Sequence, residues 1–563
     1  MISPSTGREH CRLIPAVCDV RHFAGHRLEH DVMVGKERFN WQILIGGAVG
    51  CVLIIVSILL RVGPLMDRPI WFDEAFSWTL ATEFTPSEII RRTSDDVHPP
   101  LYYLVLQVWV QVFGESLTAM RGLSVSLGTL TVIAAFLLGM VADQTGGRNE
   151  CGETEATPGI ARAYVSGLIF AGLIGLSAFQ IHWSTEVRMY ALLSFLFMLS
   201  TLFAVLAVSR SPDGVGWWAA FAVTSAAMLY THNYGLFSFV ALAMFLALAV
   251  TLREHRRGRG WLTRPVVMCL GSLMLAGVLY LPWVPILLAQ KAQVAEDYWM
   301  TKFTCSSLAV AWDHLFVPEE AWGPWQSVRG AVFLSVVVGC CLLLQYRGGL
   351  FDRLCLFLTV VPFGLAVLLS ITGASSIIRD RVFILIHLAA LLTVTRAVTR
   401  WFNPLPALLL GSLLMVDGWW VYHRYVPRLD ISARQGARAA MQRIEADDGP
   451  SVPVIVVQPC IYFSLKYHAT DRSRVLLYTS PENIRHYTGG PILREQEFHV
   501  IDRLNELSGD DIWIATSSGY TAGFREPLLP RNWRAGDSEE FPAAWHFEGR
   551  IRLTRYERVT ASD

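Results

Sequence analysis

Long apolar blocks separated by short polar segments dominate the chain, and no finer periodicity runs through them. Eleven apolar runs of about 15 to 25 residues recur, each near the length that an α-helix needs to cross a bilayer. This pattern predicts a polytopic α-helical membrane protein with about eleven transmembrane helices. The runs fall at about 42–60, 122–142, 163–181, 190–209, 216–230, 235–252, 265–288, 330–345, 354–373, 382–395 and 404–421.

Composition agrees with this class. Of the 563 residues, 53% are hydrophobic and only 17% are charged, which disfavours the alternative of a large soluble core with buried helices. The net charge is zero, so we expect no nucleic-acid partner. The 10 cysteines are scattered without a metal-ligand spacing, and we expect neither structural zinc nor a disulfide framework.

Basic residues indicate how the chain is oriented. The strongest cluster lies at 253–264, and smaller ones lie at 347–353 and 396–400. Placing them in the cytoplasm makes the N-terminus cytoplasmic and the end of the chain external, provided that 101–113 does not cross. We therefore expect 99–113 to form a juxtamembrane or re-entrant helix, with its prolines in the first turn. A bent true span is the alternative.

The end of the chain has a different character. Short apolar strands are expected at 453–457, 474–478 and 511–516, after a helical stretch at about 432–446. This order predicts a small extracytoplasmic α/β domain. It has no glycine-rich phosphate loop and no nucleophile elbow, so we interpret it as an accessory or acceptor-contacting domain. The predicted divisions are a cytoplasmic tail at 1–40, a membrane domain at 41–423 with its first external loop at 63–120, and the terminal domain at 424–563.

Two adjacent acids, Asp73 and Glu74, follow the first apolar run and are flanked by aromatic residues. Acids beside a bilayer are costly and usually mark a site. Docking of the aromatic residues would reduce the solvation of a carboxylate and raise its pKa. The pair could bind a divalent cation, or one acid could act as a base. A solvated loop acid is the alternative.

Further ionisable and aromatic groups fall on the same outer surface under the chosen crossing count. Guanidinium groups suit a lipid phosphate, and a histidine in a polar turn could also touch one. The simpler alternatives are an aromatic belt, an interfacial ion pair, a tight hairpin turn and anchoring to lipid headgroups. The candidate substrate-binding residues are His98, Tyr102, Glu186, Arg188, Tyr190, His232, Arg379 and Arg381.

The order of these motifs resembles the GT-C superfamily of membrane glycosyltransferases. The acidic pair is followed by a His-Pro-Pro-Leu-Tyr-Tyr segment that runs to Phe113 and Gly114, then by Arg121 and a Glu-x-Arg-x-Tyr motif at 186–190. More narrowly, the chain resembles the bacterial glycosyltransferase family 39 group, which is related to protein O-mannosyltransferases and to the aminoarabinose transferase of lipid A. The resemblance covers roughly residues 40–400.

The resemblance implies that a sugar carried on a polyprenyl phosphate is handed to an acceptor outside the cytoplasm, at the cell membrane. It implies that Asp73 is the general base and Glu74 the second acid of the motif. Arg381 matches the arginine of a late Arg-Tyr motif, although Val382 replaces the tyrosine. The other matched positions are His98, Glu186, Arg188 and Tyr190.

This chemistry is coherent on its own terms. A lipid phosphate needs charge stabilisation as it leaves, which Arg188, Arg381 or His232 could provide. Attack from the side opposite the phosphate would invert the anomeric centre. A divalent metal at Asp73 and Glu74 stays open, as do the sugar and the acceptor, which could be a protein, a lipid or a glycan. A transporter or flippase and a non-catalytic scaffold are the competing interpretations.

Overall fold

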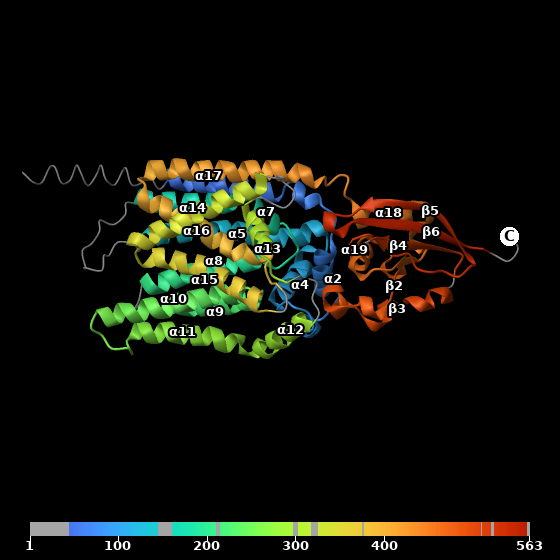
Figure 1. The fold of residues 1–563 in the computed structure, drawn as a ribbon, viewed down its shortest axis with the longest axis horizontal. Helices are drawn as coiled ribbons and strands as arrows, with labels where there is room; N and C mark the ends of the chain where they lie inside the picture. The colour runs from blue at the N-terminus through green and yellow to red at the C-terminus, as the bar shows by residue number, and fades with distance from the viewer. Residues whose placement is uncertain are drawn as a thin grey trace, which may run out of the picture.

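The computed structural model describes residues 44–144, 160–209, 214–296, 302–316, 325–373, 376–507, 509–519 and 523–559. A bundle of long helices forms one part of the elongated molecule, and a sheet domain caps one end of that bundle (Figure 1). The predicted tail at 1–40 lies outside the described residues.

Over the residues that the structure describes, each of the eleven predicted apolar runs falls mainly on helices. Among the described residues, nine helices are long and apolar enough to cross a membrane, whereas α6 and α9 have 16 and 15 residues. The protein is therefore a multi-pass membrane protein. After the first helix (44–61) the helices of the bundle are α5 (Leu117–Gln144), α6 (Ile160–Gly175), α8 (Tyr190–Ser209), α9 (Val215–Leu229), α10 (Gly235–Arg256), α11 (Arg264–Tyr280), α14 (Trp325–Arg347), α15 (Leu350–Thr372), α16 (Ile384–Trp401) and α17 (Pro404–Tyr425).

Two of the predicted runs are broken. The first helix of the run at 163–181, α6, ends at Gly175, and a short helix, α7 (Ala178–Trp183), starts separately. The Ser177 side chain caps α7 by accepting a hydrogen bond from a backbone N–H of that helix. The run at 265–288 is divided by a 3-10 turn, Leu281–Trp283, before α12 (Val284–Glu296). Pro282 lies in this turn, and proline lacks the N–H that a continuous helix needs.

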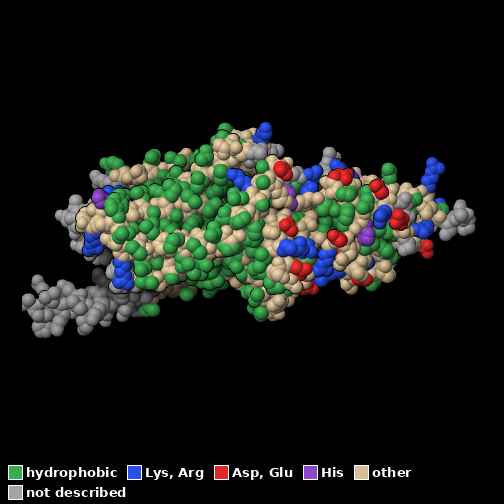
Figure 2. All heavy atoms as spheres, turned by 90° about the horizontal axis from the view of Figure 1, so that it is seen from below, with side chains coloured by type: hydrophobic (Ala, Val, Ile, Leu, Met, Phe, Trp, Pro, Cys, Tyr) green, Lys and Arg blue, Asp and Glu red, His purple; other side chains and the backbone are tan. Residues whose placement is uncertain are grey.

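The surface of the bundle is apolar. Met274 of α11 and Leu413 of α17 are 69% and 68% exposed. Figure 2 shows hydrophobic side chains covering the bundle, while charged side chains gather at its far end and over the sheet domain. An apolar surface of this extent suits lipid tails rather than water. Helix α16 differs, because its apolar segment is 100% buried within the protein.

The predicted first external loop is mostly helical. It contains a 3-10 turn at Pro64–Asp67, then α2 (Phe72–Glu83), α3 (Pro86–Ser94) and α4 (Leu101–Phe113). These elements lie where the bundle meets the sheet domain (Figure 1). Helix α4 has 13 residues and is about 20 Å long, which is short of the ~30 Å apolar thickness of a bilayer. Its length favours the predicted juxtamembrane placement. The two prolines were predicted in its first turn, whereas the helix begins just after them.

The C-terminal domain contains one six-stranded sheet in the order β3-β2-β1-β4-β6-β5. Strands β1 to β4 are parallel, and β6 runs antiparallel to both β4 and β5. The predicted helix is α18 (Gly436–Asp448), and a second helix is α19 (Pro459–His468). The predicted strands are β1 (Val454–Val456), β2 (Val475–Thr479) and β4 (Asp511–Ser517), whereas β3 (Phe498–Val500), β5 (Trp533–Pro542) and β6 (Arg550–Arg558) were not predicted.

Candidate active site

Asp73 lies in the first turn of α2 rather than in a loop. The aromatic residues around it are docked, as the sequence predicts. Trp71 packs edge-on against Trp545 and Phe547 of the C-terminal domain, with ring centroids 6.2 and 5.8 Å apart. The Asp73 side chain nevertheless keeps 19% of its surface exposed. Asp73 is therefore a partly accessible carboxylate on a fixed helix.

Two arginines from distant segments face one oxygen of Asp73. Arg381 Nη1 lies 3.3 Å from Asp73 Oδ2, and Arg188 Nε lies 3.8 Å from the same atom. Arg188 is buried, and its Nη1 donates to the Asp73 carbonyl at 3.3 Å and to the Tyr103 hydroxyl at 3.4 Å. The other oxygen, Asp73 Oδ1, accepts no hydrogen bond from the described residues. One carboxylate oxygen is thus held by cations and the other is open.

Glu74 points into the protein and has a different environment. It is fully buried and forms a two-pronged ion pair with Arg121, in which Nε and Nη2 donate to Oε1 and Oε2 at 2.9 and 2.6 Å. The Val187 N–H also donates to Oε1 at 3.0 Å. These donors occupy both oxygens, so the geometry favours a structural role and does not fit the predicted role of Glu74 in catalysis.

The same contacts bear on the predicted cation site. The Arg121 guanidinium occupies the space beside Glu74 that a cation bridging the two acids would need. Across the part of the chain that the structure describes, three or more His, Cys, Asp or Glu side chains nowhere gather in a metal-binding arrangement. The described residues therefore do not fit a metal ion shared by Asp73 and Glu74.

Glu186 and Arg188 serve different partners, as expected for residues two positions apart. They lie in the non-helical segment between α7 and α8. Glu186 is buried 3.2 Å from Arg68 Nη1 and 3.6 Å from His182 Nε2. Burial raises the pKa of its carboxyl group to about 7. Glu186 therefore belongs to a group next to the Asp73 site, and only Arg188 reaches Asp73.

His232 and His98 meet beside the two arginines. Their ring centroids are 5.4 Å apart, and Tyr190 lies 5.9 Å from the His232 ring. Burial, together with the nearby His98, Arg188 and Arg381, lowers the pKa of His232 well below its usual value. His232 Nδ1 accepts the Tyr234 N–H at 3.1 Å, which places the proton of the neutral ring on Nε2. His232 is thus a neutral hydrogen-bond donor.

Two predicted residues remain, Tyr102 and Arg379. Tyr102 is buried beside Tyr103, with ring centroids 5.6 Å apart. Arg379 is exposed just before the 3-10 turn that carries Arg381.

Two residues of the site were not predicted. Tyr103 contacts Arg188 through its hydroxyl group, and Asp96 Oδ2 lies 2.9 Å from His98 Nδ1. The acid two positions before the histidine was a visible signal for the Asp96 contact. Arg121 was noted as part of the motif order, but no role was assigned to it.

Comparisons with family models and with curated protein sequences find no match. Solved structures do match. ArnT from Cupriavidus metallidurans in the apo state gives a TM-score of 0.52 at 14% identity, covering 85% of this chain and 93% of that chain. The same protein bound to undecaprenyl phosphate gives 0.53 at 13% identity, covering 92% and 98%.

These similarities show that the chain has the GT-C glycosyltransferase fold, which confirms the predicted resemblance at the level of fold. In particular, it shares the overall architecture of ArnT over nearly the whole of both chains.

Proposed function

We propose that this protein is an integral-membrane glycosyltransferase that moves a sugar from a polyprenyl-phosphate donor to an extracytoplasmic acceptor at the cell membrane. One observation carries the proposal: within a GT-C fold, Asp73 Oδ2 faces Arg188 and Arg381 while Oδ1 is open. The ArnT structure with undecaprenyl phosphate supports a lipid phosphate as the donor class.

The two arginines are suited to the donor phosphate. In the structure they face a carboxylate, and a phosphate offers guanidinium groups the same sign of charge and matching geometry. A bound phosphate would draw Arg381 and Arg188 toward itself and release Asp73 Oδ2. The neutral His232 adds an N–H donor next to them. Together these groups would stabilise the charge that develops as the lipid phosphate leaves.

The open oxygen of Asp73 supports a role for this residue in activating the acceptor. Its open oxygen would take the proton from an acceptor hydroxyl or amine as the oxygen or nitrogen of that group bonds to the anomeric carbon. The bond from that carbon to the phosphate oxygen breaks, and its electron pair stays on the lipid phosphate. Attack from the side opposite the phosphate would invert the anomeric centre. A positioned base of this kind contributes about 10²- to 10⁴-fold to the rate.

The orientation of the chain supports an extracytoplasmic site. The connections between α10 and α11 and between α16 and α17 lie at one end of the bundle, and α2, α4 and the C-terminal domain lie at the other (Figure 1). The first of these connections carries Arg257 and Arg259, and Arg256 ends the helix before it. Basic loops favour the cytoplasm, so the Asp73 end would face outward.

A donor panel would test the proposal. Membranes containing the wild-type protein are incubated with a series of labelled polyprenyl-phosphate sugars, and the labelled products are identified by mass spectrometry. Membranes containing the D73N variant serve as the control. We expect a product from at least one donor that requires Asp73. A wild-type protein that gives no Asp73-dependent product with any donor would contradict the proposed function.

A further inference from the structure

The C-terminal domain holds both ends of α2, the helix that carries Asp73. At the first turn, the Phe72 N–H donates to Glu548 Oε1 at 3.3 Å. At the last turn, Lys466 Nζ lies 2.9 Å from Glu83 Oε1, and Arg494 Nη2 donates to the Glu83 carbonyl at 2.5 Å. These contacts span the full 12 residues of the helix.

Glu548 supplies an acceptor that α2 itself lacks. The N-cap residue Trp71 makes no side-chain capping hydrogen bond, and the first N–H groups of a helix have no partner within it. Glu548, which lies 476 positions after Phe72 in the chain, accepts one of these N–H groups. Its second oxygen accepts the Trp545 N–H at 3.2 Å, which fixes the side chain in its own loop. The capped residue, Phe72, directly precedes Asp73.

The C-terminal end of α2 has cations where the helix dipole favours them. Lys466 and Arg494 approach this end, and cations stabilise the last turn of a helix. Both residues come from the C-terminal domain, which also supplies Glu548 as a hydrogen-bond acceptor at the first turn.

Aromatic packing closes the N-terminal contact. Trp71 lies against Trp545 and Phe547, which precede Glu548 by three positions and one position in the chain. The Arg68 guanidinium lies 4.8 Å from the centre of the Trp545 ring. The loop that carries Glu548 therefore contacts both the residue before the helix and the first turn of α2.

We propose that the C-terminal domain is part of the active site and that Glu548 is a positioning residue, which sets the place of Asp73 through the first turn of α2. The inference rests on the proposed function, because it takes Asp73 to be the base. Small displacements of a reacting group are costly: a misplacement of about 1 Å can lower a rate by about 10²-fold. The domain thus does more than contact an acceptor.

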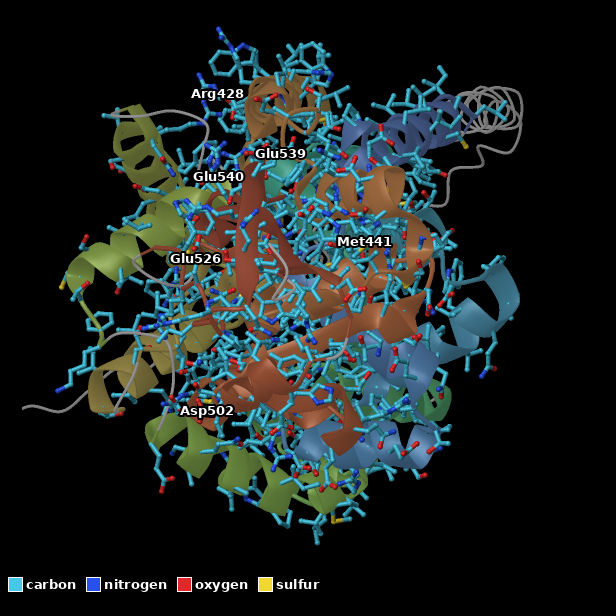
Figure 3. All side chains as sticks on the ribbon, turned by 90° about the vertical axis from the view of Figure 1, so that its right-hand side faces the viewer. Arg428, Met441, Asp502, Glu526, Glu539 and Glu540 are labelled. Carbon is cyan, nitrogen blue, oxygen red and sulfur yellow. The ribbon has the colours of Figure 1, made fainter. Side chains whose placement is uncertain are left out.

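The test uses the full-length protein with E548A and E548Q. The matched control is E539A. Glu539, labelled in Figure 3, lies on β5, and it pairs with Arg443 inside the same domain. Transfer kinetics are measured together with amide hydrogen exchange of residues 72–80. We expect E548A to speed exchange in this segment and to lower kcat by about 10- to 100-fold at an unchanged donor KM. E548Q keeps an acceptor for the Phe72 N–H and should recover most of kcat, and E539A should match the wild type.

Two outcomes would overturn the inference. One is wild-type exchange and wild-type kcat in E548A. The other is an E548Q variant as inactive as E548A whose α2 exchange is that of the wild type, since loss of activity would then not pass through the helix. If the wild-type protein transfers no sugar at all, the proposed function fails separately, and the exchange of residues 72–80 still decides whether Glu548 holds α2.

Discussion

Arg381 Nη1 lies 3.3 Å from Asp73 Oδ2, although the two residues are 308 positions apart in the chain. The contact joins the first turn of α2 to the 3-10 turn that precedes α16. Arg188 adds a third segment, the turn before α8. The site therefore forms only when helices from both halves of the membrane domain are packed together.

Replacing Asp73 with asparagine should abolish sugar transfer without affecting insertion. The amide keeps the size of the side chain but removes the base, so we expect a loss of kcat of at least about 10²-fold. Transfer assays on purified protein measure the change. The control is D67N, because Asp67 is exposed a few positions before the helix. Near-normal turnover in D73N would remove Asp73 as the base.

Replacing Arg381 with alanine should weaken use of the donor more than use of the acceptor. Loss of a charge-assisted contact to phosphate costs about 1.5–3 kcal/mol, which corresponds to a rise in donor KM of about 10- to 100-fold. R188A should act in the same direction. The comparison is R428A, because Arg428 is exposed beyond the end of α17 (Figure 3). An unchanged donor KM in both variants would place the phosphate elsewhere.

Replacing Glu74 with alanine should act on stability. It leaves Arg121 buried without its partner, and breaking a buried ion pair in this way costs about 3–5 kcal/mol. Thermal unfolding of the detergent-solubilised protein would show the loss. The double variant E74A with R121M should unfold at a higher temperature than E74A alone, since no charge is left unpaired. An E74A variant that is as stable as the wild type but inactive would instead indicate a catalytic role for Glu74.

Stability should fall as the pH rises toward 8. Burial raises the pKa of Glu548 from 4.5 to about 8. Between these values the unfolded chain has released the proton and the folded protein retains it, so raising the pH favours unfolding. Midpoints of thermal unfolding between pH 5 and 8 should therefore decline, and less steeply in E548Q. The same slope in both proteins would show that Glu548 does not titrate in this range.

Residue 425 should lie outside the cytoplasm and residue 258 inside it. A reporter that works only outside the cytoplasm should therefore be active when fused after residue 425, and a reporter that works only in the cytoplasm should be active when inserted at 258. The basic loop between α10 and α11 and the C-terminal domain lie at opposite ends of the bundle (Figure 1). Reporter activity in whole cells checks the assignment. The same side for both insertions would contradict the crossing count.

The helices could be predicted because lipid leaves the backbone few choices. A long apolar segment must satisfy its own polar groups, and a helix does so within the segment. Because the helices alternate in direction, the connections that carry Asp73, Arg188, His232 and Arg381 could be assigned to the same end of the bundle. The breaks at Gly175 and Pro282 were harder to predict, since a hydrophobicity pattern does not show where a helix pauses.

The different environments of Asp73 and Glu74 could not be predicted from the sequence. Adjacent residues on a helix point about 100° apart, so one faces the open side and the other the interior, and only packing decides which. The buried ion pair with Arg121 holds Glu74 on the interior side. Glu548 carries no local signal at all, because its role depends on a contact across most of the chain.

The burial of α16 has a consequence for how the protein responds to the surrounding membrane. Its apolar segment is fully buried within the protein, and Arg381 stands at the end of that segment that meets Asp73. The depth of that cation is therefore set by neighbouring helices and not by the thickness or fluidity of the surrounding lipid. Membranes that differ in tail length should tilt or strain the peripheral helices first, while the spacing of charges around Asp73 stays the same.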